Sequence, residues 1–197
     1  AAEVARGTYE RGRQHGLRSM GVPRSLFRPL LALEDTPPIA IRCQPVALNP
    51  GEEAFLDAID AALQHGVSGM LGGGGHHAEP GRGGALSPVN DLGIGVHYLR
   101  RRVRRVMIVD LDVHFGNGTA AGFPDDAELF LFDYHGHAAG LHRPTTPHLF
   151  RTFRDVPDGK AYLAALRREL PTALEAFRPE ACLYLAGMDV FSGTPNP

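Results

Sequence analysis

The chain has little cysteine: two residues, Cys43 and Cys182, in a sequence of 197 residues that also has no tryptophan. The two cysteines are far apart and lack the close spacing of a metal site. This argues against a disulfide framework and favours a reducing compartment. Cys182 lies in an apolar run, which predicts a buried position in the core.

Long apolar runs are also missing. No stretch approaches the roughly 20 apolar residues of a membrane-spanning helix. The charged residues 1–14 lack the apolar region of a signal peptide. We therefore expect a cytoplasmic protein with no membrane partner.

A large excess of one charge is absent, since the formal net charge is −2 at pH 7. This balance provides no general attraction to nucleic acid. The run Arg100–Arg105 is a local basic cluster, but it falls where a helix is expected to end, and helix C-termini favour cations. We expect no direct nucleic-acid partner.

Apolar residues make up 43% of the chain, enough for one substantial core. We expect a single domain over residues 1–197. Residues 1–50 are its poorly patterned part, because prolines interrupt every long element there.

From residue 51 onward the pattern alternates between helix and strand. Helical spacing predicts helices over 52–65, 90–101 and 159–177, the last kinked or divided by Pro171. Apolar runs predict strands over 67–71, 103–114, 128–134 and 182–186, with a turn at 116–119 and a loop over 136–157. This alternation predicts an α/β fold with a mainly parallel sheet.

Polar side chains follow three of the expected strands. His76 and His77 follow the first, Asp112 and His114 end the second, and Asp189 follows the last. The carboxyl ends of parallel strands lie at one edge of a sheet, where such folds bind ligands. Strand alternation would place Asp110, Asp112 and His114 on the same face.

Two carboxylates and one imidazole give three protein ligands and leave a position open, which is the pattern of a catalytic metal site. Asp112, His114 and Asp189 are our candidate ligands, with Zn²⁺ as the expected ion and Fe²⁺ or another divalent ion as an alternative. His76 and His77 can move protons near neutral pH. Asp110 and Asn117 are candidate orienting partners for them.

Five segments together resemble a known family. The segments are Gly73–Ala78, Asn90–Asp91, Asp110–Thr119, Val156–Leu163 and Ala186–Asp189. They are similar to the zinc-dependent histone deacetylase and acetylpolyamine amidohydrolase superfamily, and to its bacterial members in particular. The resemblance implies a three-layer arginase–deacetylase-like fold, incomplete at both ends.

The resemblance also implies an activity and roles for the site residues. The activity is the removal of acetyl groups from acetylated lysine or acetylpolyamine by a metal-activated water. By position, His77 is the main proton-transfer residue and pairs with Asn117, while His76 pairs with Asp110. In this family Asp110 also helps to hold a structural monovalent cation.

The chain departs from the family pattern at several positions. Phe115 stands where many members have a second histidine, and strand alternation places it on the outward face. Leu86 replaces an aromatic wall residue of the substrate tunnel, Asp133 replaces a serine near the cation, and Thr194 replaces a customary aspartate. The chain stops before the family's tyrosine motif, which supplies an oxyanion donor worth about 10²–10³ in rate.

Two alternatives follow from these departures and from the shared architecture. One is a catalytically impaired fragment or pseudoenzyme that acts as a binding protein. The other is an arginase-like hydrolase with a two-metal carboxylate site. The adjacent histidines His76 and His77 favour the deacetylase pattern over the second. The sequence leaves the oligomeric state open.

Overall fold

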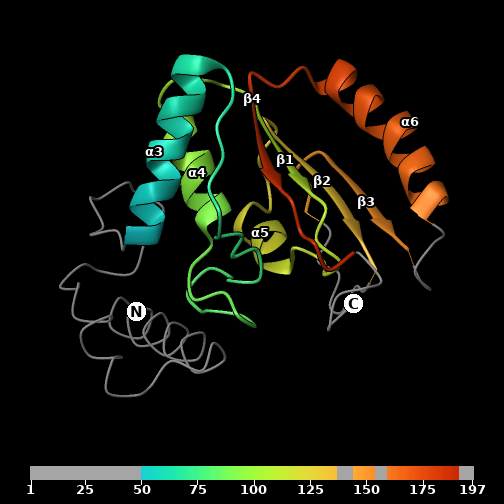
Figure 1. Ribbon diagram of the computed structural model, residues 1–197, viewed down its shortest axis with the longest axis horizontal. Helices are drawn as coiled ribbons and strands as arrows, with labels where there is room; N and C mark the ends of the chain where they lie inside the picture. The colour runs from blue at the N-terminus through green and yellow to red at the C-terminus, as the bar shows by residue number, and fades with distance from the viewer. Residues whose placement is uncertain (1–49, 137–143, 154–158, 191–197) are drawn as a thin grey trace. The chain divides into compact units, whose positions relative to one another are not determined.

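The computed structural model describes residues 50–136, 144–153 and 159–190 (Figure 1). The chain divides into two compact units, residues 1–98 and 99–197, and each is described by itself. The expectation of one domain stays a prediction. Residues 1–49, which include Cys43, lie outside the described part, and so does Thr194.

The described part of the first unit contains two helices joined by an irregular segment. Helix α3 spans Pro50–His65 and helix α4 spans Asp91–Leu99, close to the predicted ranges. The Tyr98 hydroxyl donates a hydrogen bond of 2.6 Å to the Asp60 carboxylate and so ties the two helices together. Ile59 and Val96 are among the buried apolar side chains of these helices.

The strand expected over residues 67–71 is absent from the described part of the first unit, where these residues are irregular. Val67 and Leu71 are 80% and 104% exposed, so neither side chain is held by a core. Gly66, Gly69 and Gly72 punctuate the segment, and glycine weakens a strand because it loses much conformational entropy on ordering.

The described residues of the second unit form a four-stranded parallel sheet with strand order β3-β2-β1-β4 (Figure 1). The strands are β1 (Val106–Asp110), β2 (Leu129–His135), β3 (His148–Thr152) and β4 (Ala181–Leu185). All five β1 residues are buried, as expected for a central strand covered on both faces. The predicted α/β fold with a parallel sheet is confirmed.

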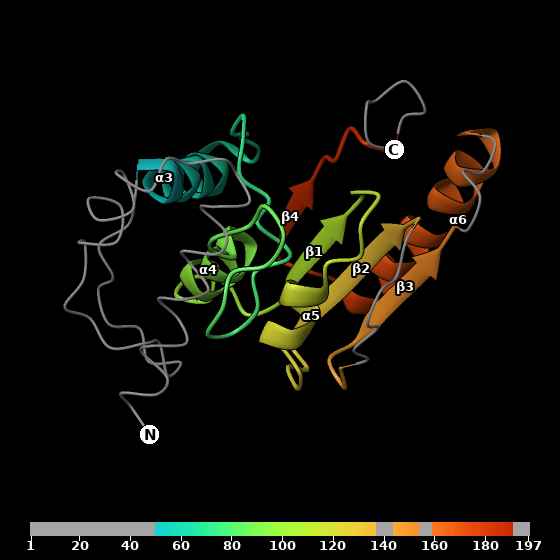
Figure 2. The same cartoon turned by 90° about the horizontal axis from the view of Figure 1, so that it is seen from below.

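Helices cover both faces of this sheet. Helix α6 (Gly159–Phe177) packs on one face, where Ala165 and Ala173 join a buried cluster with Met107, Val109 and Phe132. Helix α5 (Asn117–Gly122) lies on the opposite face (Figure 2). Its buried residues Thr119 and Ala120 line a small pocket with Ile108 and Leu131. The unit therefore has three layers.

Two local predictions are wrong, and tertiary packing explains both. The loop expected over 136–157 contains strand β3, an edge strand whose partly exposed side chains give no clear alternation. The turn expected over 116–119 is instead the start of α5. Glycine and asparagine favour turns in isolation, but burial of Thr119 and Ala120 stabilises a short helix here.

Helix α6 agrees with its predicted range, but Pro171 does not divide it. Its apolar side chains hold it against the sheet on both sides of the proline, among them Leu166 and Leu174. Cys182 is exposed rather than buried, because β4 is an edge strand of the described sheet. Among the described residues, no helix is both long and apolar enough to span a membrane.

Candidate metal centre and histidine turn

The chain leaves the sheet immediately after Asp110, because aspartate side chains compete for the backbone donors. Asp110 Oδ1 accepts a hydrogen bond of 3.1 Å from the Asp112 N–H, and Asp112 Oδ1 accepts one of 2.8 Å from the His114 N–H. Such local bonds replace the pairing that would extend a strand. The predicted strand over 103–114 is therefore too long, and its alternation does not continue past Asp110.

This irregular segment nevertheless brings Asp112 and His114 together with Asp189. The His114 Nδ1 atom lies 3.0 Å from Asp112 Oδ1 and 3.1 Å from Asp189 Oδ2. One ligand atom from each residue lies within 4.8 Å of the other two. The three side chains are partly accessible, with 48% of His114, 20% of Asp112 and 23% of Asp189 exposed.

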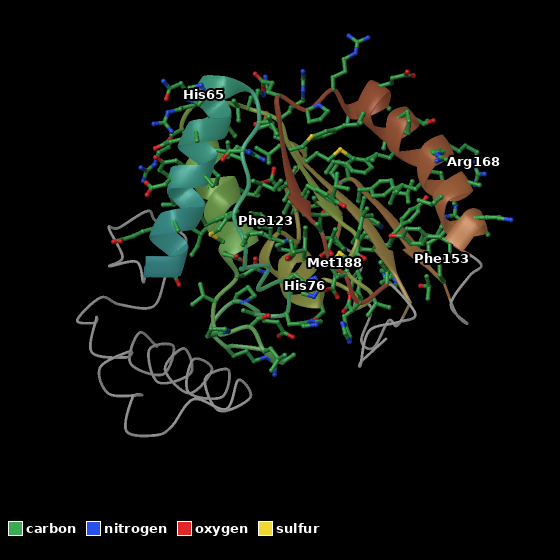
Figure 3. All side chains as sticks on the ribbon, viewed as in Figure 1. His65, His76, Phe123, Phe153, Arg168 and Met188 are labelled. Carbon is green, nitrogen blue, oxygen red and sulfur yellow. The ribbon has the colours of Figure 1, made fainter. Side chains whose placement is uncertain are left out.

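Asp189 reaches this place because the segment after β4 runs alongside the segment after β1. Met188 marks that segment in Figure 3, at the carboxyl end of the sheet. The Leu111 N–H donates to the Leu185 carbonyl at 3.1 Å, which extends the contact between the strands by one bond. Farther along, the Val113 N–H donates to Asp189 Oδ1 at 3.0 Å. One carboxylate oxygen thus fixes the backbone, and the other faces His114.

The donor set fits a divalent cation. Two carboxylates this close repel each other, and a cation between them relieves that repulsion. Two aspartates and a neutral imidazole are a ligand set that Zn²⁺ and Fe²⁺ both accept. Their partial exposure leaves room for other ligands. The residues Asp112, His114 and Asp189 are the group in the described part that could hold a metal.

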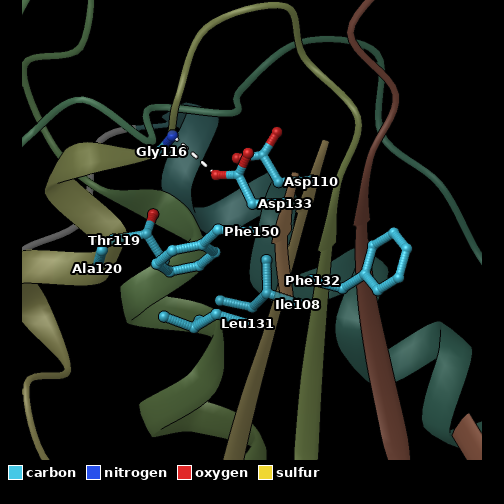
Figure 4. A pocket seen from close by; sticks show the side chains of 9 residues that line it. All are labelled: Ile108, Asp110, Gly116, Thr119, Ala120, Leu131, Phe132, Asp133 and Phe150. Atoms are coloured by element: carbon cyan, nitrogen blue, oxygen red, sulfur yellow. Dashed lines mark hydrogen bonds between the residues drawn. The ribbon is translucent and has the colours of Figure 1, made fainter. Parts of the chain in front are cut away.

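A second polar group is buried beside the centre, on strand β2. Asp133 stands in register with Asp110, and both are almost fully buried, at 4% and 3% exposed. Asp133 Oδ2 accepts a hydrogen bond of 2.9 Å from the Gly116 N–H (Figure 4). Its Oδ1 accepts one of 2.7 Å from His135 Nδ1, whose Nε2 lies 2.8 Å from Thr152 Oγ1. The chain of contacts ties β2 to β3 and to the start of α5.

Phe115 is buried, at 2% exposed, and so the outward position predicted for it is wrong. Its ring packs edge-on against His135, with ring centroids 4.9 Å apart, and against Phe150 at 5.0 Å. The error has the same origin as the overlong strand, because alternation fails beyond Asp110. The stretch Asp133–His135 differs from the family pattern near the expected cation. The sequence gives no part to Thr152, whose contact with His135 is made between two strands.

Tyr162, on α6, places a hydroxyl group in the interior of the second unit. Its oxygen is buried and has no hydrogen-bond partner among the described residues. Burial, followed by the charges near it, including those of Asp110 and Asp133, raises the pKa of Tyr162 to about 12. The hydroxyl therefore stays protonated near the acidic edge of the sheet.

His76 and His77 lie in the first unit, on a tight turn that follows four glycines. Gly72, Gly73 and Gly74 have φ angles of 114°, 85° and 84°, in the left-handed region that glycine adopts without penalty. His76 is 3% exposed, His77 is half-buried, and their ring centroids are 4.2 Å apart (His76 is labelled in Figure 3). Asp110 and Asn117 belong to the second unit, so their pairing with the histidines stays a prediction.

Comparison with known proteins gives one family and several relatives. A sequence model of the histone deacetylase domain matches residues 46–196. An uncharacterised protein of Picosynechococcus is 36% identical over 134 residues, 67% of this chain and 45% of its own length. Histone deacetylase 2 of Arabidopsis thaliana is 33% identical, over 70% of this chain and 37% of its own length. Acetoin utilization protein AcuC of Staphylococcus aureus is 28% identical, over 64% of this chain and 36% of its own length.

Solved structures with the same fold include the HD domain of HDA15, with a TM-score of 0.63, and an acetylpolyamine aminohydrolase from Burkholderia pseudomallei, with a TM-score of 0.67. Both are 22% identical in sequence and align over 74% of this chain and 47% of theirs. The predicted deacetylase-like fold is confirmed. The chain spans less than half the length of the relatives it matches.

Proposed function

The chain belongs to the histone deacetylase domain family, and on that premise we propose that it hydrolyses acetyl amides in a metal-dependent reaction. The products are acetate and a free amine. The observation that carries the proposal is the gathering of Asp112, His114 and Asp189 within 4.8 Å beyond the ends of β1 and β4. A carboxylate-rich, partly open site of this kind suits hydrolysis better than a closed structural metal site.

Asp112, His114 and Asp189 would hold the metal, with Zn²⁺ as the first candidate and Fe²⁺ as the second. A divalent ion bound there supplies a Lewis acid for the amide carbonyl and lowers the pKa of water. The Val113 N–H keeps the Asp189 carboxylate oriented through its bond to Oδ1. The family resemblance adds a structural monovalent cation beside Asp110, where Asp133 supplies a second buried carboxylate.

The two histidines would handle the protons. His77 takes a proton from the attacking water on a ring nitrogen and later delivers it to the nitrogen of the leaving amine. His76, which is more deeply buried, would tune the electrostatic environment of the reacting groups. The resemblance assigns Asn117 as the orienting partner of His77 and Asp110 as that of His76. A positioned acid–base residue contributes about 10²–10⁴ to a rate.

Two substrate classes agree with the names of the relatives. One similar protein is a histone deacetylase and one similar structure is an acetylpolyamine aminohydrolase. Acetylated lysine and acetylated polyamine both present an acetyl amide on a flexible alkyl chain. The proposed deacetylase reaction could therefore act on either substrate class. An assay should offer one substrate of each class.

The test measures metal content and turnover on the same purified 197-residue chain. We expect one zinc per chain by elemental analysis, and release of acetate from an acetyl-lysine peptide or from N-acetylputrescine. The Asp112→Ala and His114→Ala variants should lose the zinc. Asp57→Ala and His65→Ala, which alter exposed residues of α3, should keep it. A His114→Ala variant with stoichiometric zinc would overturn the ligand assignment.

The His77→Ala variant separates an enzyme from a binding protein of the same fold. If the proposal holds, this variant keeps its zinc and loses turnover by about 10²–10⁴. Wild-type chain that binds zinc but releases no acetate from either substrate would contradict the proposed activity. That result would support the catalytically impaired alternative.

A further inference from the structure

Two adjacent residues at the start of α4 hold the histidine turn from both sides. We propose that Asn90 and Asp91 are positioning residues, which fix the His76 and His77 imidazoles by clamping the backbone before and after them. The functional part of this inference rests on the proposed deacetylase activity. Its structural part rests on hydrogen bonds within the first unit alone.

Asp91 holds the backbone that precedes the histidines. Its Oδ2 accepts a hydrogen bond of 2.7 Å from the Gly74 N–H, and its Oδ1 accepts one of 2.6 Å from the Gly75 N–H. The carboxylate is 8% exposed, and Oδ1 also accepts from the Leu92 N–H at 3.1 Å. Hydrogen bonds to a buried charged acceptor are roughly twice as strong as neutral ones. The two glycine N–H groups are therefore held firmly.

Asn90 holds the backbone that follows the histidines. Its Nδ2 donates a hydrogen bond of 3.2 Å to the Ala78 carbonyl. Its Oδ1 accepts one of 2.8 Å from the Gly93 N–H, which caps the first turn of α4. One side chain thus connects the far end of the turn to a helix, just as its neighbour connects the near end.

The glycines before His76 allow the close approach that these hydrogen bonds need, and their backbone freedom means that the turn needs such bonds to stay in place. A Cβ atom on Gly73 would lie 2.3 Å from Asp91 Oδ2, and one on Gly75 would lie 2.0 Å from the Val89 carbonyl oxygen. Side chains at these positions would therefore force the turn away from α4. Four consecutive glycines have high backbone freedom. Without external contacts, the histidines after them would sample many positions, and a displacement of about 1 Å can cost about 10²-fold in rate.

The alternative is that Asn90 and Asp91 only stabilise α4. Asn90 is well placed to cap the helix, and an acidic residue in the first turn interacts favourably with the helix dipole. The two interpretations differ for Asn90→Asp. Aspartate keeps the oxygen that accepts from Gly93, but it cannot donate to the Ala78 carbonyl. A cap-only residue tolerates this change, whereas a clamp does not.

The main readout is the mutual ring-current shift of the two imidazoles, observed by NMR on the full chain with labelled histidine. Rings whose centroids are 4.2 Å apart shift each other's signals only while their geometry is fixed. We expect two signals distinct from that of the exposed His65, assigned with His76→Gln and His77→Gln. In Asp91→Asn and Asn90→Asp, both signals should move toward that of His65 or broaden.

Asp60→Asn is the matched control, because it removes the same charge and weakens a bond to α4, from Tyr98, away from the turn. It should leave the imidazole signals unchanged. Unchanged signals in Asp91→Asn and Asn90→Asp, with melting temperatures lowered as in Asp60→Asn, would overturn the clamp.

The kinetic readout applies if the proposed function also holds. Asp91→Asn then lowers kcat about 10- to 100-fold and alters the pH profile of kcat, with a smaller effect on KM. Absence of wild-type turnover would reject the proposed activity and leave the NMR result decisive for the clamp.

Discussion

Gly187 passes so close to Asp112 that no side chain fits between them. A Cβ atom at position 187 would lie 2.5 Å from the Asp112 Cα and 2.9 Å from Asp112 Oδ2. This approach lets the segment after β4 continue along the segment after β1, so that Asp189 reaches the Val113 N–H. The glycine therefore sets the distance between two of the proposed metal ligands.

Replacing Gly187 with alanine should weaken metal binding. The new methyl group has to push Asp112 or the backbone at 187 aside, which separates Asp112 from Asp189. Changes just outside a ligand set typically cost about 10- to 100-fold in metal affinity. Competition with a zinc chelator measures this loss. Gly122→Ala is the control, because a Cβ atom there meets nothing within 4 Å. Equal zinc affinities for the two variants would show that the close approach has no part in the centre.

Much of the second unit could be predicted from sequence, because its central elements have strong local signals. Strands β1, β2 and β4 are apolar runs, and α6 has its apolar side chains at helical spacing. Strand β3 has no such signal. Its residues are partly exposed, and its position depends on pairing with β2, which local sequence does not encode.

The candidate centre shows the same division between local and long-range information. Parallel strands end at one edge, so the sequence suffices to bring Asp112, His114 and Asp189 to the same region. Strand alternation does not reveal that the Asp110 and Asp112 side chains bond to the backbone and end the strand. It also does not reveal the close approach of Gly187 to Asp112. The outward position predicted for Phe115 is wrong for that reason.

Glu169 should make the second unit sensitive to acid. Its carboxylate accepts hydrogen bonds from the Tyr134 hydroxyl at 2.6 Å, from Arg151 Nε at 2.7 Å and from Arg168 at 2.8 Å. Burial alone would raise the pKa of Glu169, but these bonds outweigh it, and the pKa lies below its usual value of 4.5. The folded state then binds fewer protons than the unfolded state. The stabilisation is complete above pH 4.5 and is lost as pH falls through the lowered pKa.

Glu169→Gln should therefore destabilise the fold at pH 7 and matter less in acid. Hydrogen bonds to a charged group contribute about 1.5–3 kcal/mol, so we expect a loss of that order at pH 7. Urea unfolding at pH 7 and at successively lower pH values below 4.5 measures the difference from wild type. Glu175→Gln, an exposed position on the same helix, should change little. A Glu169→Gln deficit that stayed constant down to the lowest pH would contradict the linkage.

Removal and addition of metal should change the stability of the wild-type chain but not that of Asp189→Asn. A ligand that binds only the folded state stabilises it by about 2.7 kcal/mol at 100 times its Kd, so zinc should raise the melting temperature and a chelator should reverse the rise. Asparagine keeps an oxygen that can accept from the Val113 N–H, as Asp189 Oδ1 does at 3.0 Å. It removes the charge that repels Asp112, so the metal-free variant should be about as stable as the metal-free wild type. The zinc-dependent rise alone should disappear, and an equal rise in both chains would mean that zinc binds elsewhere.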